Sequence, residues 1–266
     1  MNKIKLSIST CFNYGVSIEE QIPLITEAGF THVSLGQNLQ HFDYLSADKR
    51  QQLSRLLDQF NLNIDTIHGP QADKTDLVKL ANVAQSAVDL HAPVVVMHAG
   101  PFEFGENELT TRLAQLKEKI LNMQDIGHRR GIIFALENVL PGPATELVRR
   151  AIIETDSSHV GFCYDSSHDQ IEGPRPFTLV SELRNRLVAV HLSDRVKEFV
   201  DHVIPGDGFI RWDELCAVLR TSPKGFPLLL EVMMVNSEEK DPSKFLQLAF
   251  ISGKRLYSQI HDQVTE

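Results

Sequence analysis

The chain has 266 residues, of which 42% are hydrophobic and 23% are charged, proportions typical of a soluble globular protein with a sizeable core. Its formal net charge of −9 argues against a nucleic-acid partner, because neutralising phosphates requires clustered Lys and Arg. Three cysteines without paired spacing indicate free thiols, and no apolar run is long enough for a signal peptide or a membrane span. We therefore expect a cytoplasmic protein that does not enter a membrane.

Short strand patterns alternate with helical patterns along the whole chain. In chain order, the strands are predicted at 3–9, 31–35, 62–68, 93–98, 132–137, 160–165, 187–191 and 228–231. The helices that follow them are predicted at 17–28, 47–60, 74–90, 106–128, 143–154, 177–185, 212–220 and 242–260. The first helix opens with the spacing of a capping box at residues 17–20. Residues 193–210 form the longest segment without a predicted element, and long loops after barrel strands are usually functional.

The pattern of the strands indicates their environment. The last five are continuous apolar runs rather than alternating ones, as in parallel strands that are buried on both faces. Eight strand–helix units in a chain of this length predict a single (β/α)8 TIM barrel, an α/β fold. No linker or change in composition indicates a second domain, so we expect one domain over residues 1–266.

Six consecutive predicted strands end in a residue that can bind a metal ion. These residues are His68, His98, Glu137, Asp165, His191 and Glu231. The C-terminal ends of barrel strands converge at one mouth, which is where such barrels have their active sites. The residues two positions earlier share the same face of each strand, and several are small, which leaves room for a metal ion and a small ligand. They are Thr66, Val96, Ala135, Cys163, Ala189 and Leu229.

Each of these side chains taken singly could be a solvated rim residue or a satisfied core group. Together they indicate a metal site, because burying several carboxylates without a compensating cation costs too much free energy. The predicted ligands of one divalent ion are Glu137, Asp165, His191 and Glu231. Four further histidines could add metal or substrate ligands, namely His68, His98, His168 and His202. We expect Mn²⁺ or Zn²⁺ ahead of Mg²⁺ or Co²⁺, since the carboxylates suit Mn²⁺ and the added histidines favour Zn²⁺ or a cluster of several ions.

Seven short motifs resemble those of the xylose isomerase-like superfamily of barrels, which includes sugar phosphate isomerases/epimerases and endonuclease IV. They are 67–69 (Ile-His-Gly), 97–100 (Met-His-Ala-Gly), 136–138 (Leu-Glu-Asn), 164–168 (Tyr-Asp-Ser-Ser-His), 191–194 (His-Leu-Ser-Asp), 202–208 (His-Val-Ile-Pro-Gly-Asp-Gly) and 230–231 (Leu-Glu). The resemblance implies that Glu137, Asp165, His191 and Glu231 hold one metal ion. It also implies that the two glutamates form the acid/base pair and that His168 contacts the substrate.

Endonuclease IV is similar at four more positions, those of His68, His98, His168 and His202, where it binds three zinc ions. This chain departs from that pattern in one ligand. The endonuclease has Asp-x-His before its glycine turn, whereas here the Asp position is Val200, with Asp201 adjacent. The loop 69–74 also lacks the aromatic residue that the endonuclease inserts into DNA.

The leading prediction is a metal-dependent sugar or sugar-phosphate isomerase or epimerase. The metal ion would polarise a carbonyl and stabilise an enediolate, while Glu137 and Glu231 would remove and return the proton. His168 and Arg195 are predicted to orient the substrate, although Arg195 could equally be a solvated loop charge. The backbone amides of residues 206–208 could hold a phosphate or form a plain turn.

Three alternatives stay open at this stage. The chain could be a zinc-dependent endonuclease that acts at abasic sites, or a dehydratase that shares the first proton abstraction. It could also be a sugar-binding barrel without chemistry, although the intact glutamate pair argues against this reading. The sequence leaves open which sugar is bound, whether it is phosphorylated and whether the chain forms a homo-oligomer.

Overall fold

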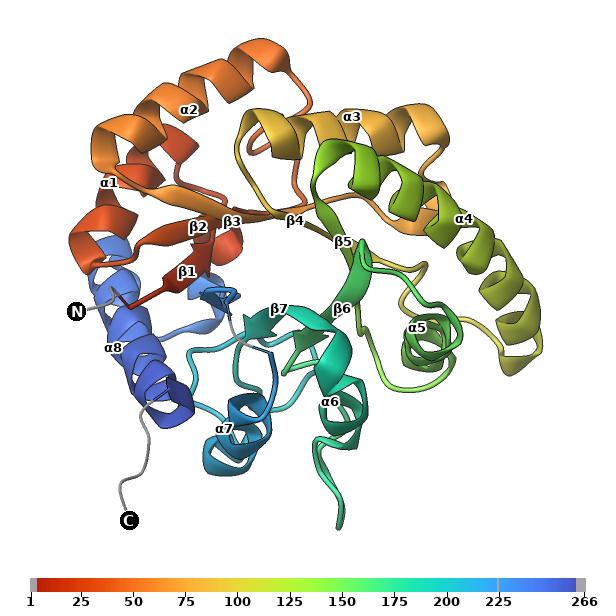
Figure 1. The fold of residues 1–266 in the computed structure, drawn as a ribbon. Helices are drawn as coiled ribbons and strands as arrows, with labels where there is room; N and C mark the ends of the chain where they lie inside the picture. Colours follow the sequence, from red (N-terminus) through yellow and green to blue (C-terminus); the bar gives the residue numbers. More distant parts are fainter. Residues whose placement is uncertain (1–3, 224, 262–266) are drawn as a thin grey trace.

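The computed structural model describes residues 4–223 and 225–261, and it confirms the predicted barrel. Eight parallel strands pair in chain order and close on themselves, with the helices on the outside (Figure 1). The strands are β1 (Leu6–Ser9), β2 (His32–Leu35), β3 (Asn63–His68), β4 (Val94–His98), β5 (Ile133–Glu137), β6 (Val160–Asp165), β7 (Leu187–Leu192) and β8 (Leu228–Leu230). The helices are α1 (Ile18–Ala28), α2 (Ala47–Phe60), α3 (Leu77–Asp89), α4 (Leu109–Arg130), α5 (Pro143–Glu154), α6 (Thr178–Leu183), α7 (Trp212–Arg220) and α8 (Pro242–His261).

Local capping signals explain where individual helices begin and end. The capping box predicted for α1 forms, because the Ser17 amide donates to Glu20 Oε2 at 3.2 Å. The same helix ends at Gly29, whose φ of 105° lies in the left-handed region that glycine adopts without strain. Helix α3 begins at Leu77, later than predicted, because the Asp76 carboxylate caps it by accepting from the Lys79 amide at 2.8 Å.

Several strand ends also differ from the prediction, mostly by one residue, and β7 ends at Leu192 rather than at His191. Strand β1 begins at Leu6 rather than at residue 3, which lies outside the described residues. Strand β8 ends at Leu230, one residue early. The Glu231 amide still donates to the Leu192 carbonyl at 3.1 Å, so the backbone geometry of the strand continues to the residue that was expected to end it.

The barrel has two apolar layers. The larger layer lies between the strands and the helices, as expected for strands that helices cover. A separate small cluster lies inside the barrel and consists of Val94, Val96, Ala135, Cys163 and Ala189. Four of these are residues that were predicted to lie beneath the metal ligands. Small side chains at this level leave space above them at the mouth.

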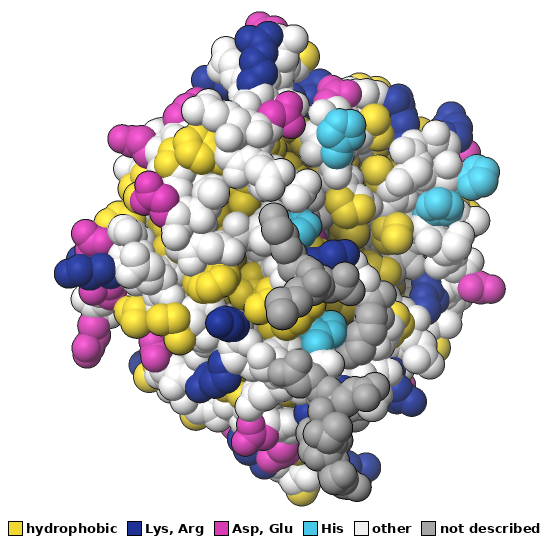
Figure 2. All heavy atoms as spheres, turned by 60° about the vertical axis from the view of Figure 1, so that its left-hand side comes forward, with side chains coloured by type: hydrophobic (Ala, Val, Ile, Leu, Met, Phe, Trp, Pro, Cys, Tyr) yellow, Lys and Arg dark blue, Asp and Glu magenta, His cyan; other side chains and the backbone are white. Residues whose placement is uncertain are grey.

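The surface carries mixed charges. Figure 2 shows one face, on which Lys and Arg side chains lie scattered among Asp, Glu and apolar side chains rather than gathered in one tract. In the described part of the chain, none of the helices combines the length and the apolar character that crossing a membrane requires. The three cysteines are free, as predicted, and all three are buried.

Candidate metal centre and active site

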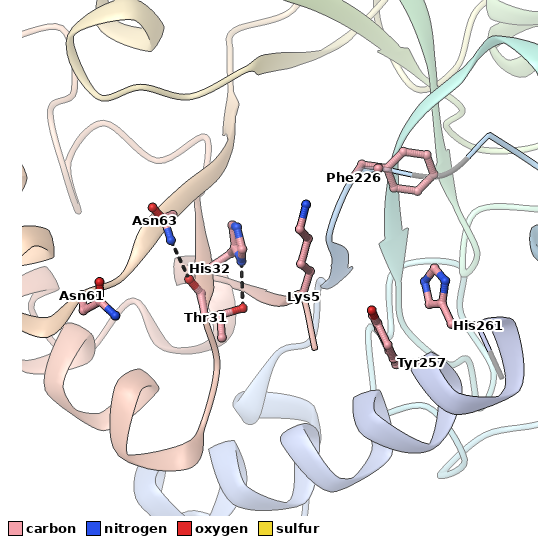
Figure 3. Close-up of a pocket in the computed structure, with 9 residues that line it drawn as sticks. Lys5, Thr31, His32, Asn61, Asn63, Phe226, Tyr257 and His261 are labelled. Carbon is pink, nitrogen blue, oxygen red and sulfur yellow. Dashed lines mark hydrogen bonds between the residues drawn. The ribbon is translucent and has the colours of Figure 1, made fainter. Parts of the chain in front are cut away.

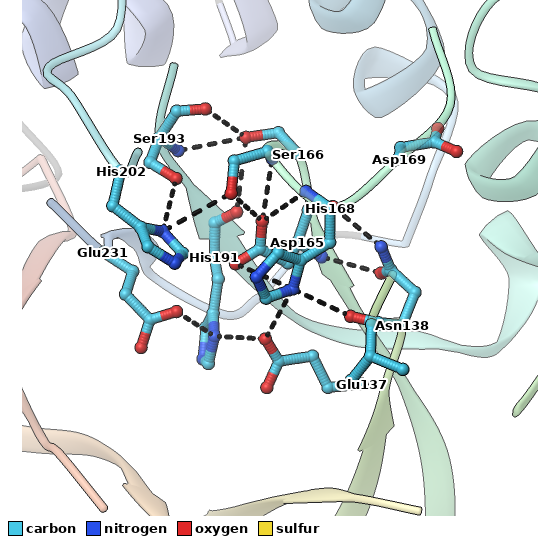
Figure 4. Close-up of polar contacts among 12 residues, drawn as sticks. Glu137, Asn138, Asp165, Ser166, His168, Asp169, His191, Ser193, His202 and Glu231 are labelled. Carbon is cyan, nitrogen blue, oxygen red and sulfur yellow. Dashed lines mark hydrogen bonds and ion pairs between the residues drawn. The ribbon is translucent and has the colours of Figure 1, made fainter. Parts of the chain in front are cut away.

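The structure brings four predicted ligands together at the C-terminal mouth. Glu137 and Asp165 are the last residues of β5 and β6, and His191 and Glu231 come from β7 and the residue after β8. One ligand atom from each of the four lies within 4.8 Å of the others. Glu137 and Asp165 are fully buried, and the Glu231 side chain is 13% exposed, so the group faces a nearly closed space. Figure 4 shows the side chains converging from neighbouring strands.

His191 lies between the two glutamates. Its Nδ1 atom is 3.2 Å from Glu137 Oε1 and 2.9 Å from Glu231 Oε2. Burial raises the pKa of Glu231, but the charge and hydrogen bond of His191 outweigh burial and lower this pKa to about 2. Burial likewise raises the pKa of Glu137, yet the charges of His191 and His98 hold it well below its usual range. Both glutamates are therefore ionised at neutral pH.

The pKa of His191 moves in the opposite direction. Burial lowers it, whereas Cys163, Glu231 and Glu137 raise it, and it ends well above its usual range. In the metal-free protein an imidazolium therefore neutralises part of the negative charge of the two glutamates. A divalent cation could replace that proton, since the neutral imidazole then becomes a ligand.

Asp165 is arranged as a metal ligand with one free oxygen. Its Oδ1 atom accepts from the Ser167 amide at 2.7 Å, the Ser167 hydroxyl at 2.8 Å and the His168 amide at 3.1 Å. Its Oδ2 atom is buried and has no hydrogen-bond partner among the described residues. An unpaired buried carboxylate oxygen is costly, and a cation would satisfy it. The donor set and this orphaned oxygen fit a divalent ion.

Three further clusters among the described residues share residues with the central one, and one of them consists of Glu137, Cys163 and His191. His68 Nε2 and His98 Nε2 lie 3.1 Å and 3.4 Å from Glu137 Oε2, the oxygen that does not face His191. The His68 and His98 rings meet edge to face, with their centroids 4.7 Å apart. Asp165 forms the third cluster, with His168 and His202. Glu137 and Asp165 thus connect four overlapping groups of candidate ligands.

His168 has one nitrogen engaged and one free. Its Nδ1 atom lies 3.1 Å from the Asn138 carbonyl, which can only accept, so Nδ1 carries the proton. Its Nε2 atom is buried and finds no partner in the described chain. The Phe102 ring meets the His98 and His168 rings with centroid distances of 4.9 Å and 6.1 Å. The His168 ring therefore lies near the Phe102 ring at the mouth.

His202 has a different environment. Its Nδ1 atom is within 3.0 Å of the Ser193 hydroxyl and 3.4 Å of the Ser167 hydroxyl. The neighbouring Asp201 belongs to none of the candidate ligand groups found among the described residues. Its Oδ2 atom accepts from the backbone amides of residues 196, 197 and 198, at 3.0, 2.6 and 2.9 Å, and so closes the loop before His202.

Arg195 is almost fully buried, with 1% of its surface exposed. Its guanidinium donates to the carbonyls of Ser167 and Asp169, both at 3.3 Å, and pairs with Glu172 at 2.6 Å. The rings of Phe199 and Phe209 lie against it, 4.1 Å and 5.0 Å from the guanidinium carbon. These contacts exclude the solvated loop charge that was an alternative for this residue. They tie the long loop to the segment that carries His168.

Asn138 belongs to the site, although the sequence argument gave it no role. Its side-chain amide accepts from the Asp165 backbone N–H at 2.8 Å and donates to the Asp165 carbonyl at 2.9 Å. Its own carbonyl orients His168, as described above. Its position directly after Glu137 at a strand end was the one signal available in the sequence, because a buried asparagine needs partners for its amide.

A separate cavity of about 580 Å³ lies at the other end of the barrel (Figure 3). Its lining comes from the starts of strands, with Lys5 before β1 and with His32 and Asn63 as the first residues of β2 and β3. Tyr257 and His261 from α8 complete one side. Active sites of these barrels lie at the opposite, C-terminal face, so the volume of this cavity does not make it the candidate active site.

Comparison with known proteins places this geometry among related barrels. Residues 22–247 match the family model described as xylose isomerase-like TIM barrel. An uncharacterized protein, y4fM, of Sinorhizobium fredii (strain NBRC 101917 / NGR234) is 25% identical over 259 residues, covering 83% of each chain. Two similar solved structures are the 3-keto-D-glucoside 4-epimerase YcjR from E. coli and the IolI protein with a bound zinc atom. YcjR has a TM-score of 0.72 at 18% identity over 96% of this chain and 99% of its own. IolI has a TM-score of 0.78 at 15% identity over 98% of this chain and 100% of its own.

Proposed function

The chain belongs to the xylose isomerase-like TIM barrel family, and on this premise we propose that it is a divalent-metal-dependent isomerase or epimerase of sugars. The observation that carries the proposal is the pair of ionised glutamates, Glu137 and Glu231, on either side of His191 within one group of ligands. The 3-keto-D-glucoside 4-epimerase and the zinc-bound IolI share the fold, which supports the choice of reaction class and of a metal ion.

Glu137, Asp165, His191 and Glu231 would hold the ion, with Mn²⁺ or Zn²⁺ preferred over Mg²⁺ or Co²⁺. When bound, the ion supplies Lewis-acid polarisation of a substrate carbonyl. One glutamate removes the proton from the carbon beside that carbonyl and later releases it to solvent, while the other glutamate takes up a proton from solvent and delivers it to the substrate. Both carboxylates have low pKa values, so each is in its basic form at neutral pH before the substrate arrives.

His168 orients the substrate in this proposal. Its Nε2 atom, which has no partner among the described residues, bonds to a sugar hydroxyl, and the Asn138 carbonyl holds the other nitrogen and so fixes the ring orientation. For Arg195 we propose an indirect effect on the substrate. Its guanidinium holds the carbonyls of Ser167 and Asp169, which flank His168 in the chain.

Solvent exchange of the proton beside the carbonyl tests the proposal. A set of ketoses is incubated with metal-loaded protein in deuterium oxide, and incorporation is followed by NMR. Wild-type protein is expected to incorporate deuterium into at least one ketose. Glu231→Gln is expected to lose exchange while it still binds the metal ion, because the amide cannot accept the proton. Glu182→Gln serves as the control, since Glu182 pairs with Arg149 on the surface.

Exchange by Glu231→Gln at the wild-type rate would show that the two-glutamate mechanism is wrong. Absence of exchange with every ketose, from protein that holds its metal ion, would remove the proposed activity itself. For any ketose that shows exchange, analysis of the reaction products separates an isomerase or epimerase from a dehydratase, which would expel water.

A second candidate, an abasic-site endonuclease, is favoured by one observation. The clusters around His68 with His98 and around His168 with His202 could hold ions beside the central one. Asp201, which is next to the position of the missing ligand, instead binds three backbone amides of its own loop. Incision of a duplex with an abasic site at low salt would support this activity, and an intact duplex at full metal loading would exclude it.

A further inference from the structure

We infer that the site takes an unphosphorylated, uncharged sugar, an inference that rests on the proposed isomerase or epimerase activity. Phosphate esters and free sugars are both open to an enzyme of this reaction class. They differ in what the mouth of the barrel must provide, because a phosphate dianion needs backbone amides or cations that are not already engaged. The loops after β7 and β8, where barrels often bind phosphate, are the place to look for such groups.

A carboxylate of the protein fills the glycine turn after β7. Asp194 is fully buried, and its two oxygens accept hydrogen bonds from four donors. These donors are the amides of Arg195 at 2.8 Å, Gly206 at 2.8 Å and Ile210 at 3.0 Å, and the Trp212 indole N–H at 2.7 Å. The arrangement resembles an anion-binding nest in which Asp194 is the anion. A phosphate cannot use these amides unless it displaces Asp194.

The position of Gly208 agrees with the occupation of the glycine turn by Asp194. A Cβ atom at Gly208 would lie 2.3 Å from the Arg195 carbonyl oxygen and 2.4 Å from Asp194 Oδ1. Gly208 is therefore required for the close approach of the turn to Asp194, and phosphate binding is not needed to explain it. Two more amides of the turn, those of Asp207 and Phe209, donate to the carbonyls of Ile204 and Arg195.

The loop after β8 also offers carboxylates where a phosphate would need donors. Asp241 Oδ1 accepts from the Lys244 amide at 2.9 Å and so occupies the N-terminus of α8. Glu239 accepts from the Asp241 amide at 2.8 Å. The Lys240 ammonium donates to the Val235 carbonyl at 3.1 Å. These three donors, the amides of Lys244 and Asp241 and the Lys240 ammonium, are thus engaged within the segment.

The charge at the centre of the mouth also disfavours a phosphate ester as the substrate. Glu137, Asp165 and Glu231 place three carboxylates around the candidate ion, one more than the two positive charges of a divalent ion require. The guanidinium of Arg195, the buried cation of the loop after β7, is already paired with Glu172. A phosphate dianion close to this centre would be repelled, whereas sugar hydroxyls can bond to carboxylates and to His168 without that cost.

Matched pairs of substrates test the inference. Each ketose that shows deuterium exchange with wild-type protein is compared with its terminal phosphate ester, and kcat/KM is measured for both. We expect the free sugar to be preferred by at least roughly 100-fold, which is well below the roughly 10⁴–10⁵-fold discrimination that unpaired polar groups in a binding site can produce. Inorganic phosphate at millimolar concentration should leave the KM of the free sugar unchanged.

A higher kcat/KM for the phosphate ester, or competitive inhibition by inorganic phosphate, would overturn the inference and leave the proposed activity intact. Absence of exchange with both members of every pair would overturn the proposed activity, and the inference with it. Deuterium exchange restricted to free sugars supports both.

Discussion

Replacing Asn138 by Asp tests whether this residue positions a metal ligand. The change preserves the size of the side chain and the acceptor for the Asp165 amide at 2.8 Å. It removes the donor to the Asp165 carbonyl at 2.9 Å and places a carboxylate oxygen against that carbonyl in a fully buried site. Leaving one buried carbonyl unpaired costs about 1–3 kcal/mol. For a protein of this size the loss should lower Tm by about 2–4 °C for each kcal/mol.

The metal affinity of the variant shows whether Asn138 positions Asp165 as a metal ligand. Partners that orient a metal ligand typically change affinity by about 10–100-fold when they are mutated, so the Kd of Asn138→Asp should rise within that range. Competition with a chromophoric chelator gives this Kd. Asn63→Asp is the matched control, because Asn63 donates to the Thr31 carbonyl at 3.4 Å from an exposed position at the other end of the barrel. Equal metal Kd values in the two variants would show that Asn138 only stabilises the strands.

Metal binding at neutral pH should release a proton from His191, whose pKa is raised in the metal-free protein, and calorimetry in buffers of different ionisation enthalpy would detect it. The stability from this raised pKa is fully present below pH 6.5 and is lost as pH rises through the folded-state value, so Tm of the metal-free protein should fall at alkaline pH. The stability from Glu231 is present above pH 4.5 and is lost as pH falls towards about 2, so Tm should also fall in acid. Elemental analysis of His68→Ala should find about one ion per chain, as in wild type, if the central ligands hold the ion, and loss of all metal would contradict this. Gly208→Ala should destabilise the fold by at least about 1–3 kcal/mol in denaturant unfolding, because its Cβ would collide with Asp194, and an unchanged midpoint would refute this account of the turn.

The sequence predicted much of the site because the relevant signals are local. Apolar runs mark the strands, and the residue that ends each run is placed at the mouth by the barrel topology alone. Glu137, Asp165 and His191 could therefore be grouped before any coordinates were known. Metal binding by this group, the roles of its members and the contribution of Arg195 to substrate binding stay predictions until they are measured.

The partners of loop side chains could not be predicted in the same way. Asp194 and Arg195 are adjacent in the chain, and nothing local indicates that one fills a nest of amides while the other is enclosed by two aromatic rings. Their partners lie up to 28 residues away in sequence, and except for Trp212 at the start of α7 they lie in loops. The pairing of Asn138 with the Asp165 backbone likewise depends on the alignment of β5 with β6.

The sequence by itself determined the barrel, the order of its strands and the chemical types gathered at its mouth. It could do so because hydrophobic periodicity and strand-end composition are properties of short segments. Only the tertiary structure decided which polar atoms are engaged and which stay free, as with the two nitrogens of His168 and the two oxygens of Asp165. Whether a polar atom finds a partner depends on the distance and orientation between segments that are far apart in the sequence. A hydrogen bond forms only within a narrow range of donor–acceptor distance and angle.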